Sequence, residues 1–286
     1  LNVNSNVVDL SDNTNISTDE LIVHIDASNP NSYSGIGSTC NNLARNIGIT
    51  TDTYNLDGAV FENGFTDKNN GNAYRDIILK TGSGYDPAGV TTSLSNHTTL
   101  NGVPVFTNLR GYSVLDAYDE NGAYVGEQVY DMSYSIWYYA VSTDLSGGRS
   151  FITPWDTSNN IQGWNMGINY SGQLYVGTAY HGAETTSITL TANNWYNIVM
   201  VSSDSGTVDF YINGVKQHTG STNWGYNYSY DTISIGGVGI DSSNYHQTNY
   251  YYNVSGPIAS VAVYNKRLIQ SEVESNYNRN CSKYGL

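Results

Sequence analysis

Short runs in which apolar and polar residues alternate, separated by Gly, Asn, Ser and Pro, recur along this chain of 286 residues. Alternation with a period of two is typical of strands that bury one face. The segment Glu20–Ala27 ("ELIVHIDA") predicts a first strand, and the turn residues Pro30, Gly35 and Gly37 follow it. Further short strands are predicted in "AVFENGFTD" and "YRDIILK". The pattern therefore predicts an all-β protein.

The strand predicted at Met132–Val141 ("MSYSIWYYAV") carries large rings at both odd and even positions. Tyr134 and Tyr138 fall on one face, and Trp137 and Tyr139 fall on the other. A strand with bulky side chains on both faces is typical of an inner strand that is covered on both sides. We therefore expect this segment at the centre of a sheet.

A β-meander is predicted after residue 194. Its first two strands are Trp195–Val201 and Thr207–Ile212, joined by a turn at Ser203–Gly206. The pair Asn213-Gly214 then predicts a tight type I′ turn, because both central residues of that turn need a positive φ.

The end of the chain predicts one more strand and one short helix. The strand lies within Pro257–Leu268, and Ser271 and Glu274 form a Ser-x-x-Glu capping box for a helix of about two turns. At the other end, residues 1–20 are polar and lack a sustained period, so we interpret them as an arm or linker. Residues 21–286 are expected to form one domain, since large β-sandwiches reach this length.

Composition narrows the classes of partner. Charged residues make up 13% of the chain, and the formal net charge of -14 rests on only 11 Lys and Arg. Nucleic acids and anionic membrane surfaces both require a basic patch, so neither is expected as a partner. No apolar run approaches the roughly 20 residues that span a bilayer, so membrane insertion is not expected. Neutral glycans, cations or basic surfaces fit this composition better.

The order of these pieces resembles the concanavalin A-like lectin/glucanase superfamily, and within it the laminin G-like jelly-roll domains. The matching segments are "LIVHIDASNPNSYSGIGSTCNNLARN", "YSIWYYAV", "NNWYNIVMV", "VDFYINGV", "ISIGG" and "GPIASVAVYNKRLIQSEVESNY". They run from about Leu21 to Tyr277. The resemblance implies a two-sheet antiparallel jelly-roll sandwich with one short C-terminal helix. It also implies six or seven strands in each sheet, one concave face and loops at its rim.

Two cysteines, Cys40 and Cys281, lie near opposite ends of the chain. They either pair or remain as two buried free thiols. Many relatives have an aromatic residue where this chain has Cys40, and that departure favours a disulfide between Cys40 and Cys281. Such a bridge would close a loop of most of the chain and restrict its unfolded state.

The carboxylates do not form the pattern that enzymatic relatives use. Those relatives hydrolyse glycans with Glu-x-Asp-x-x-Glu on one strand, which places alternate side chains in the cleft. Here Glu272 and Glu274 fall on the predicted helix and Asp209 stands alone in its strand. The Arg-rich and Gln-x-His strands of related polysaccharide lyases are also missing. We therefore expect a non-catalytic protein, with a glycoside hydrolase or lyase as the minority alternative.

The resemblance also implies that Ca²⁺ is a candidate cofactor at a loop rim. The acidic stretch "DAYDENGAYVGE" departs from an EF-hand loop, because its Gly stands at the seventh position and no helices flank it. Asp116, Asp119 and Asn121 are the candidate ligands within it. A solvated acidic turn is the alternative interpretation.

Carbohydrate binding needs flat rings that stack on sugar C–H faces, together with amides and carboxylates that accept hydrogen bonds from the sugar hydroxyls. Rings in polar loops are the candidates: Trp155, Trp164, Trp224, Tyr226, Tyr245, His246 and Tyr250. Because the chain has 26 Tyr, many rings must instead fill the core. Trp137 and Trp195 lie inside strand patterns and are assigned to packing.

The function expected is therefore a carbohydrate-binding or adhesion domain outside the cell, on the cell surface or on a virion. Its partner would be a glycan, or a protein of a cell or virion surface. The alternative is a structural subunit of a fibre, appendage or virion that assembles with further copies through its arm and Tyr-rich loops. The segment Ser243–Asn253 ("SNYHQTNYYYN") lies between two predicted strands, so we expect an enlarged rim loop there.

Overall fold

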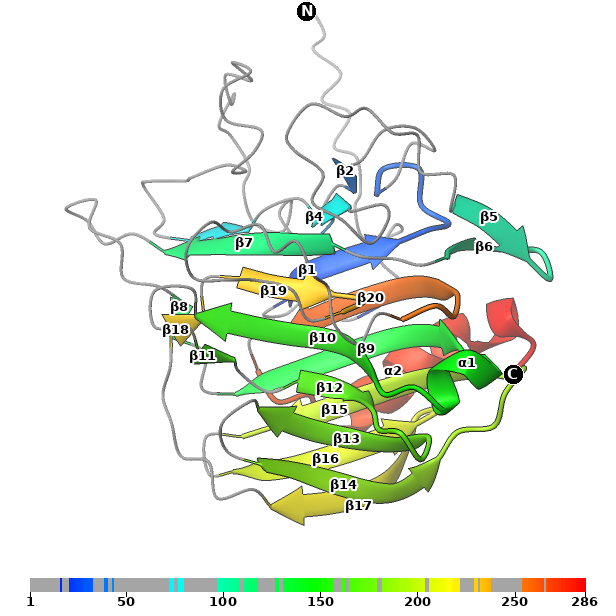
Figure 1. Ribbon diagram of the computed structural model, residues 1–286. Helices are drawn as coiled ribbons and strands as arrows, with labels where there is room; N and C mark the ends of the chain where they lie inside the picture. Colours follow the sequence, from blue (N-terminus) through cyan, green and yellow to red (C-terminus); the bar gives the residue numbers. More distant parts are fainter. Residues whose placement is uncertain are drawn as a thin grey trace, which may run out of the picture.

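The computed structural model describes the chain backbone in a set of ranges with gaps between them. The described residues are 16, 21–32, 39–40, 43, 72–74, 77–79, 97–107, 111–117, 127–128, 131–156, 161–162, 165–178, 182–203, 206–221, 229–230, 232–237, 254–264 and 266–286. Within these ranges the fold is two antiparallel sheets packed face to face, with helices at their margins (Figure 1). The all-β prediction is confirmed.

The first sheet has eight strands and contains the chain's longest apolar segments. In spatial order they are β17 (Val215–Ser221), β16 (Thr207–Ile212), β15 (Trp195–Ser202), β9 (Met132–Tyr139), β20 (Ile258–Tyr264), β6 (Val103–Phe106) and β5 (His97–Leu100), with β1 (Leu21–Asp26) also paired to β20. The predicted first strand and the predicted late strand are thus neighbours.

The second sheet has ten strands, several of them only two or three residues long. In order they are β14 (Gly182–Thr189), β13 (Gln173–Thr178), β12 (Asn165–Ile168), β10 (Arg149–Asp156), β19 (Thr232–Ile235), β7 (Gly111–Ala117), β4 (Ile77–Leu79) and β2 (Thr39–Cys40), with β11 (Ile161–Gln162) on β10 and β3 (Asn72–Tyr74) on β7. A separate pair joins β8 (Glu127–Gln128) to β18 (Ser229–Tyr230). Both sheets exceed the six or seven strands expected, the second because of its short strands β2, β3, β4 and β11.

The strand β9 lies between β15 and β20 and is buried on both faces, as predicted. Tyr134 and Tyr138 belong to the core between the two sheets, where Phe151 of β10 packs against Tyr138. Trp137 belongs to a second apolar layer on the opposite face of the sheet, together with Trp195. Both tryptophans are less than 7% exposed, which confirms their assignment to packing.

The β-meander is confirmed in detail. Residues of β15 pair with β16 from Ile198 opposite Ile212 to Ser202 opposite Val208, and β17 pairs next to β16. Asn213 has φ 52° and Gly214 has φ 79°, as a type I′ turn requires. The polar sequence of this turn therefore determines the register of β16 and β17.

The C-terminal helix α2 (Gln270–Asn280) is longer than predicted and begins differently. Ser271 lies inside the helix, and Glu274 is not the reciprocal capping residue. Instead the carboxylate of Glu272 accepts a hydrogen bond from the backbone N–H of Ile269, while the Ile269 carbonyl accepts one from the N–H of Glu272. A carboxylate in the first turn is also favoured by the helix dipole. The N-cap is therefore Ile269, two residues before the predicted Ser271, and the helix runs for 11 residues.

A one-turn 3₁₀ helix (Cys281–Tyr284) follows α2, and together they cover the outer face of the first sheet (Figure 1). At the other end of the chain, Ile16 packs against the cluster that contains Leu21 and Leu268. The predicted arm is thus in contact with the domain at that residue, and its other residues lie outside the described part of the chain.

Candidate functional site

The outer face of the second sheet, at its β14 edge, carries a row of exposed hydroxyls. Along β14, Thr185, Ser187 and Thr189 are exposed, whereas the intervening Thr186 is buried and donates a hydrogen bond to the Leu174 carbonyl. This period-two alternation is the pattern of a strand that packs one face on the core and exposes the other. We call Tyr175, Thr185, Ser187 and Thr189 the hydroxyl face.

Tyr175 is the aromatic member of the hydroxyl face. It lies in β13, opposite Thr185 on one side and Gly167 on the other. A Cβ built on Gly167 would lie 2.7 Å from Cε1 of the Tyr175 ring and would also meet the Arg149 carbonyl oxygen. The ring therefore covers the glycine, and only the missing side chain lets it lie so close. Tyr175 remains half-buried, so part of the ring reaches solvent.

A chain of buried polar groups holds the Tyr175 hydroxyl. Asn165 donates from Nδ2 to the Tyr175 hydroxyl at 2.9 Å, and its Oδ1 accepts a hydrogen bond from the Ser150 hydroxyl at 2.5 Å. Ser150 in turn lies 2.8 Å from the Thr153 hydroxyl. Buried polar groups are stable only when they are paired, and satisfied networks restrict their members to one arrangement. The ring is therefore held in one position before any ligand arrives.

Among its described side chains, the hydroxyl face has no Asp, Glu, Lys, Arg or His. Oε1 of Glu184 in β14 lies 3.3 Å from Nε2 of His218 in β17. Because β17 belongs to the opposite sheet, this contact spans the two sheets at their edge. The basic residue of β10, Arg149, is committed to contacts elsewhere, as described next. The face therefore offers hydroxyls and an aromatic ring but no charge.

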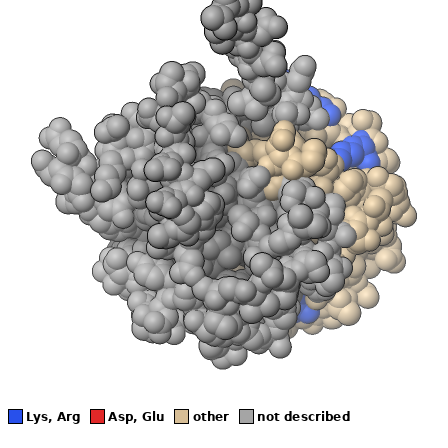
Figure 2. All heavy atoms as spheres, turned by 90° about the horizontal axis from the view of Figure 1, so that it is seen from above, with Lys and Arg blue, Asp and Glu red and all other residues tan. Residues whose placement is uncertain are grey.

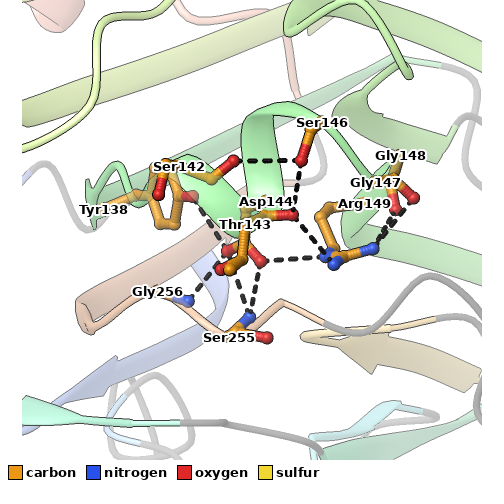
Figure 3. A network of polar contacts seen from close by, with 10 residues as sticks. All are labelled: Tyr138, Ser142, Thr143, Asp144, Ser146, Gly147, Gly148, Arg149, Ser255 and Gly256. Atoms are coloured by element: carbon orange, nitrogen blue, oxygen red, sulfur yellow. Dashed lines mark hydrogen bonds and ion pairs between the residues drawn. The ribbon is translucent and has the colours of Figure 1, made fainter.

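Arg149 belongs to a network around the buried carboxylate of Asp144, which lies in the one-turn helix α1 (Ser142–Leu145) (Figure 3). Its Nε is 2.8 Å from Oδ1 of Asp144, and its terminal nitrogens donate to the carbonyls of Thr143, Gly147 and Gly148. All of these acceptors come from the connection between β9 and β10.

The same carboxylate also ties that connection to the chain that enters β20. The backbone N–H groups of Ser255 and Gly256 donate to Asp144, the latter at 2.8 Å, and the Tyr138 hydroxyl donates at 2.9 Å. Burial and the adjacent negative charge of Asp144 raise the pKa of Tyr138 well above its usual value, so the phenol stays a donor. Because every contact is internal, this cluster serves structure rather than ligand binding.

Of the aromatic residues and the histidine that the sequence suggested as ligand contacts, the structure describes only Trp155. Trp155 was expected in a polar loop, but it lies in β10, where its backbone pairs with Gln162 of β11 and Thr232 of β19. The strand continues that far because it has partners on both sides. The other candidates lie outside the described residues: Trp164, Trp224, Tyr226, Tyr245, His246 and Tyr250.

The sequence interpretation missed the hydroxyl face. The signal was present in "ETTSITL", where Thr185, Ser187 and Thr189 alternate with Thr186 and Ile188. A search for aromatic residues in loops gave no weight to hydroxyls on a strand. Tyr175 itself could not be distinguished from the other tyrosines without its contact with Gly167.

The candidate calcium ligands lie at the margin of what the structure describes. The backbone of Asp116 is in β7, and Asp119 and Asn121 lie outside the described residues. Among the described side chains, no group of three His, Cys, Asp or Glu lies close enough to hold a metal ion. The calcium site stays a prediction.

The expected disulfide is not formed in the structure. Cys281 has a free thiol, which packs against the aromatic layer on the outer face of the first sheet and lies 3.7 Å from the Asn278 carbonyl oxygen. Cys40 lies in β2, at the far edge of the second sheet. The two cysteines are on different layers because the C-terminal helix packs outside the first sheet.

Charge is distributed unevenly between the described side chains and the rest of the chain. Seven of the 25 Asp and Glu and six of the 11 Lys and Arg have described side chains, so this part contributes a net charge of -1 out of -14. Lys and Arg side chains are visible among the described residues on the side shown in Figure 2. The described side chains therefore account for little of the acidity that the composition shows. In the described residues, no helix is long and apolar enough to cross a membrane.

Comparison with solved structures finds similar folds at low sequence identity. A mutant sialidase of Trypanosoma rangeli with trans-sialidase activity aligns with 95% of this chain at 14% identity and a TM-score of 0.53. The receptor binding domain of botulinum neurotoxin C/D mosaic serotype aligns with 92% at 12% identity and a TM-score of 0.50. The chain spans 34% of the sialidase and 52% of the toxin domain. These similarities establish the fold alone.

A search of curated proteins found no match. A laminin G-type family model, described as the concanavalin A-like lectin/glucanases superfamily, matches residues 111–274, which is more than half of the chain. That range includes β7, the central strand β9, the β-meander and the first turn of α2. The chain therefore belongs to the concanavalin A-like lectin/glucanase superfamily, as its sequence pattern predicted.

Proposed function

We propose that this protein is a non-catalytic carbohydrate-binding domain that acts outside the cell, and that the hydroxyl face is its sugar-binding surface. The observation that carries the proposal is the Tyr175 ring, held over Gly167 and fixed through its hydroxyl by Asn165, beside exposed hydroxyls on the next strand. An aromatic ring with a few fixed polar groups is the usual composition of a small-molecule site.

The chemistry of this surface suits sugars. A half-exposed ring offers an apolar surface to sugar C–H groups, and each Thr or Ser hydroxyl both donates and accepts hydrogen bonds, as sugar hydroxyls do. Because the ring is fixed before binding, less conformational freedom is lost when the ligand arrives. The family description, which names lectins, supports this class of ligand. A sialidase of similar fold has been solved in complex with sialic acid.

The rings predicted in loops complete the proposal. Trp155 lies two residues beyond Thr153 in β10, the strand that supplies the polar groups behind Tyr175. We propose that Trp155 and the candidate loop rings also contact the ligand. A calcium ion held by Asp116, Asp119 and Asn121 is also proposed. A rise in melting temperature when Ca²⁺ is added to chelator-treated protein would support that site.

A glycan array tests the proposed function directly. The wild-type protein is expected to bind, and Tyr175→Ala is expected to lose binding. Because Asn165 Nδ2 then lacks its acceptor, binding is measured at a temperature at which circular dichroism shows this variant to be folded. Tyr175→Phe keeps the ring but removes the hydroxyl that Asn165 holds, so it should weaken binding without abolishing it. If the wild type binds no glycan with or without Ca²⁺, the proposal is wrong, and a structural subunit becomes the better interpretation.

A further inference from the structure

We infer that the ligand of the hydroxyl face is a neutral oligosaccharide of more than one sugar that lies along β14. This inference rests on the proposed function and specifies the class of ligand. Three observations carry it: the absence of charge among the described residues of this face, the commitment of the nearby ionisable groups, and the length of the hydroxyl row.

The first observation concerns acidic sugars. A sialic acid or uronate carries a carboxylate, and burying a carboxylate against a surface without a cation costs free energy that hydroxyl contacts do not offset. The hydroxyl face presents Tyr175, Thr185, Ser187 and Thr189, and none of these carries a positive charge. Acidic sugars should therefore bind more weakly than their neutral counterparts.

The second observation is that the neighbouring ionisable side chains already have partners. Arg149 is the basic residue among the described strands of this sheet, and Asp144 together with backbone carbonyls occupies its guanidinium. Glu184 of β14 is directed to His218 of the opposite sheet. Turning either group towards a ligand on the outer face would break its present contact.

The third observation is the length of the row. Thr185, Ser187 and Thr189 stand at alternate positions of one strand, so the row extends over about 13 Å. One pyranose ring covers only part of that distance. A chain of two or three sugars reaches all three hydroxyls while one of its rings contacts Tyr175, which pairs with Thr185.

The test uses pairs of glycans of equal length that differ only in a carboxylate, such as sialyllactose and its methyl ester, and neutral oligosaccharides of increasing length. Neutral members are expected to bind more tightly than their acidic counterparts, and affinity should rise from one sugar to three. Thr185→Val removes one hydroxyl at nearly constant volume and should weaken binding about tenfold. Ser187→Ala should have a similar effect.

Two further variants sharpen the result. Thr98→Val changes an exposed threonine of β5 in the other sheet, so it should leave binding unchanged. Thr185→Lys adds a cation to the face and should shift preference towards acidic glycans. Tighter binding of the acidic members by the wild type would overturn the neutral assignment while leaving the proposed function intact. Binding that survives both Thr185→Val and Ser187→Ala would overturn the placement on β14, and no binding to any glycan would overturn the proposed function itself.

Discussion

The ring of Tyr284, two residues before the last residue of the sequence, lies flat on the ring of Trp137 in the central strand β9, with centroids 3.9 Å apart and planes 12° from parallel. The ring of Tyr277 also stacks on the Trp137 indole, with centroids 5.8 Å apart. The Trp195 indole packs against the ring of Tyr284, with centroids 4.9 Å apart. Stacked rings of this kind add to the free energy of burial. The C-terminal helix is therefore held on the sheet by aromatic contacts rather than by a disulfide.

Replacing Tyr284 tests this anchor. Tyr284→Ala should lower the free energy of unfolding by about 3 kcal/mol, because it removes a buried ring and leaves Trp137 partly uncovered. Tyr284→Phe keeps the stack and should cost less than about 1 kcal/mol. Urea denaturation followed by tryptophan fluorescence measures both. Equal effects of the two variants would show that the hydroxyl, and not the stack, matters.

The Asp144 carboxylate should be one of the least replaceable side chains. Asp144→Ala leaves the Arg149 guanidinium without its partner and two backbone N–H groups without an acceptor, so a loss of about 3–5 kcal/mol in the free energy of unfolding is expected. Tyr138→Phe removes a single hydrogen bond from the same network and should cost about 1 kcal/mol. Chemical denaturation separates these values, and similar losses would contradict the central role of the carboxylate.

Stability should fall in acid because of His24. Burial, assisted by the nearby positive charge of Lys283 and opposed by Asp26, lowers the pKa of this histidine from 6.5 to about 4. The unfolded chain therefore binds more protons than the folded one between these values, and stability is lost as the pH falls through that window. The lowered pKa of His24 contributes about 3 kcal/mol to the free energy of unfolding. This contribution is fully present above pH 6.5 or so and absent below about pH 4.

The comparison variant for this prediction is His24→Gln, which cannot titrate. The difference in free energy of unfolding between the wild type and this variant should shrink by about 3 kcal/mol from pH 7 to pH 4. Urea denaturation at a series of pH values measures it. A difference that stays constant over that range would show that His24 keeps an ordinary pKa.

Gly167 should be required by both the fold and the hydroxyl face. Gly167→Ala places a Cβ against the Arg149 carbonyl and 2.7 Å from the Tyr175 ring, so the ring must move. A loss of about 1–3 kcal/mol in stability and a marked loss of glycan binding are expected. Gly102→Ala is the control, since a Cβ there meets nothing within 4 Å and the cost comes from its positive φ alone. This control should bind glycans as the wild type does.

Periodicity and turn chemistry were enough to predict most of the first sheet. The rings at alternate positions of β9 and the Asn213-Gly214 turn are local signals, and both predictions were confirmed. The start of the helix was predicted incorrectly. More than one carboxylate near Ile269 could cap the helix, and only the structure shows that Glu272 accepts the hydrogen bond from the Ile269 backbone N–H. Trp155 was assigned to a loop because nothing local showed that β11 and β19 would pair with it.

The sequence by itself determined the all-β class, the central strand, the meander and the family, because each depends on which residues follow one another along the chain. Only the tertiary structure decided that Tyr175 lies over Gly167, that Asp144 ties the connection between β9 and β10 to Ser255 and Gly256, and that Cys281 faces the aromatic layer. Those relationships depend on which faces of the two sheets meet. The pattern of a single strand shows that it has a buried face, but it does not show which distant residue covers that face.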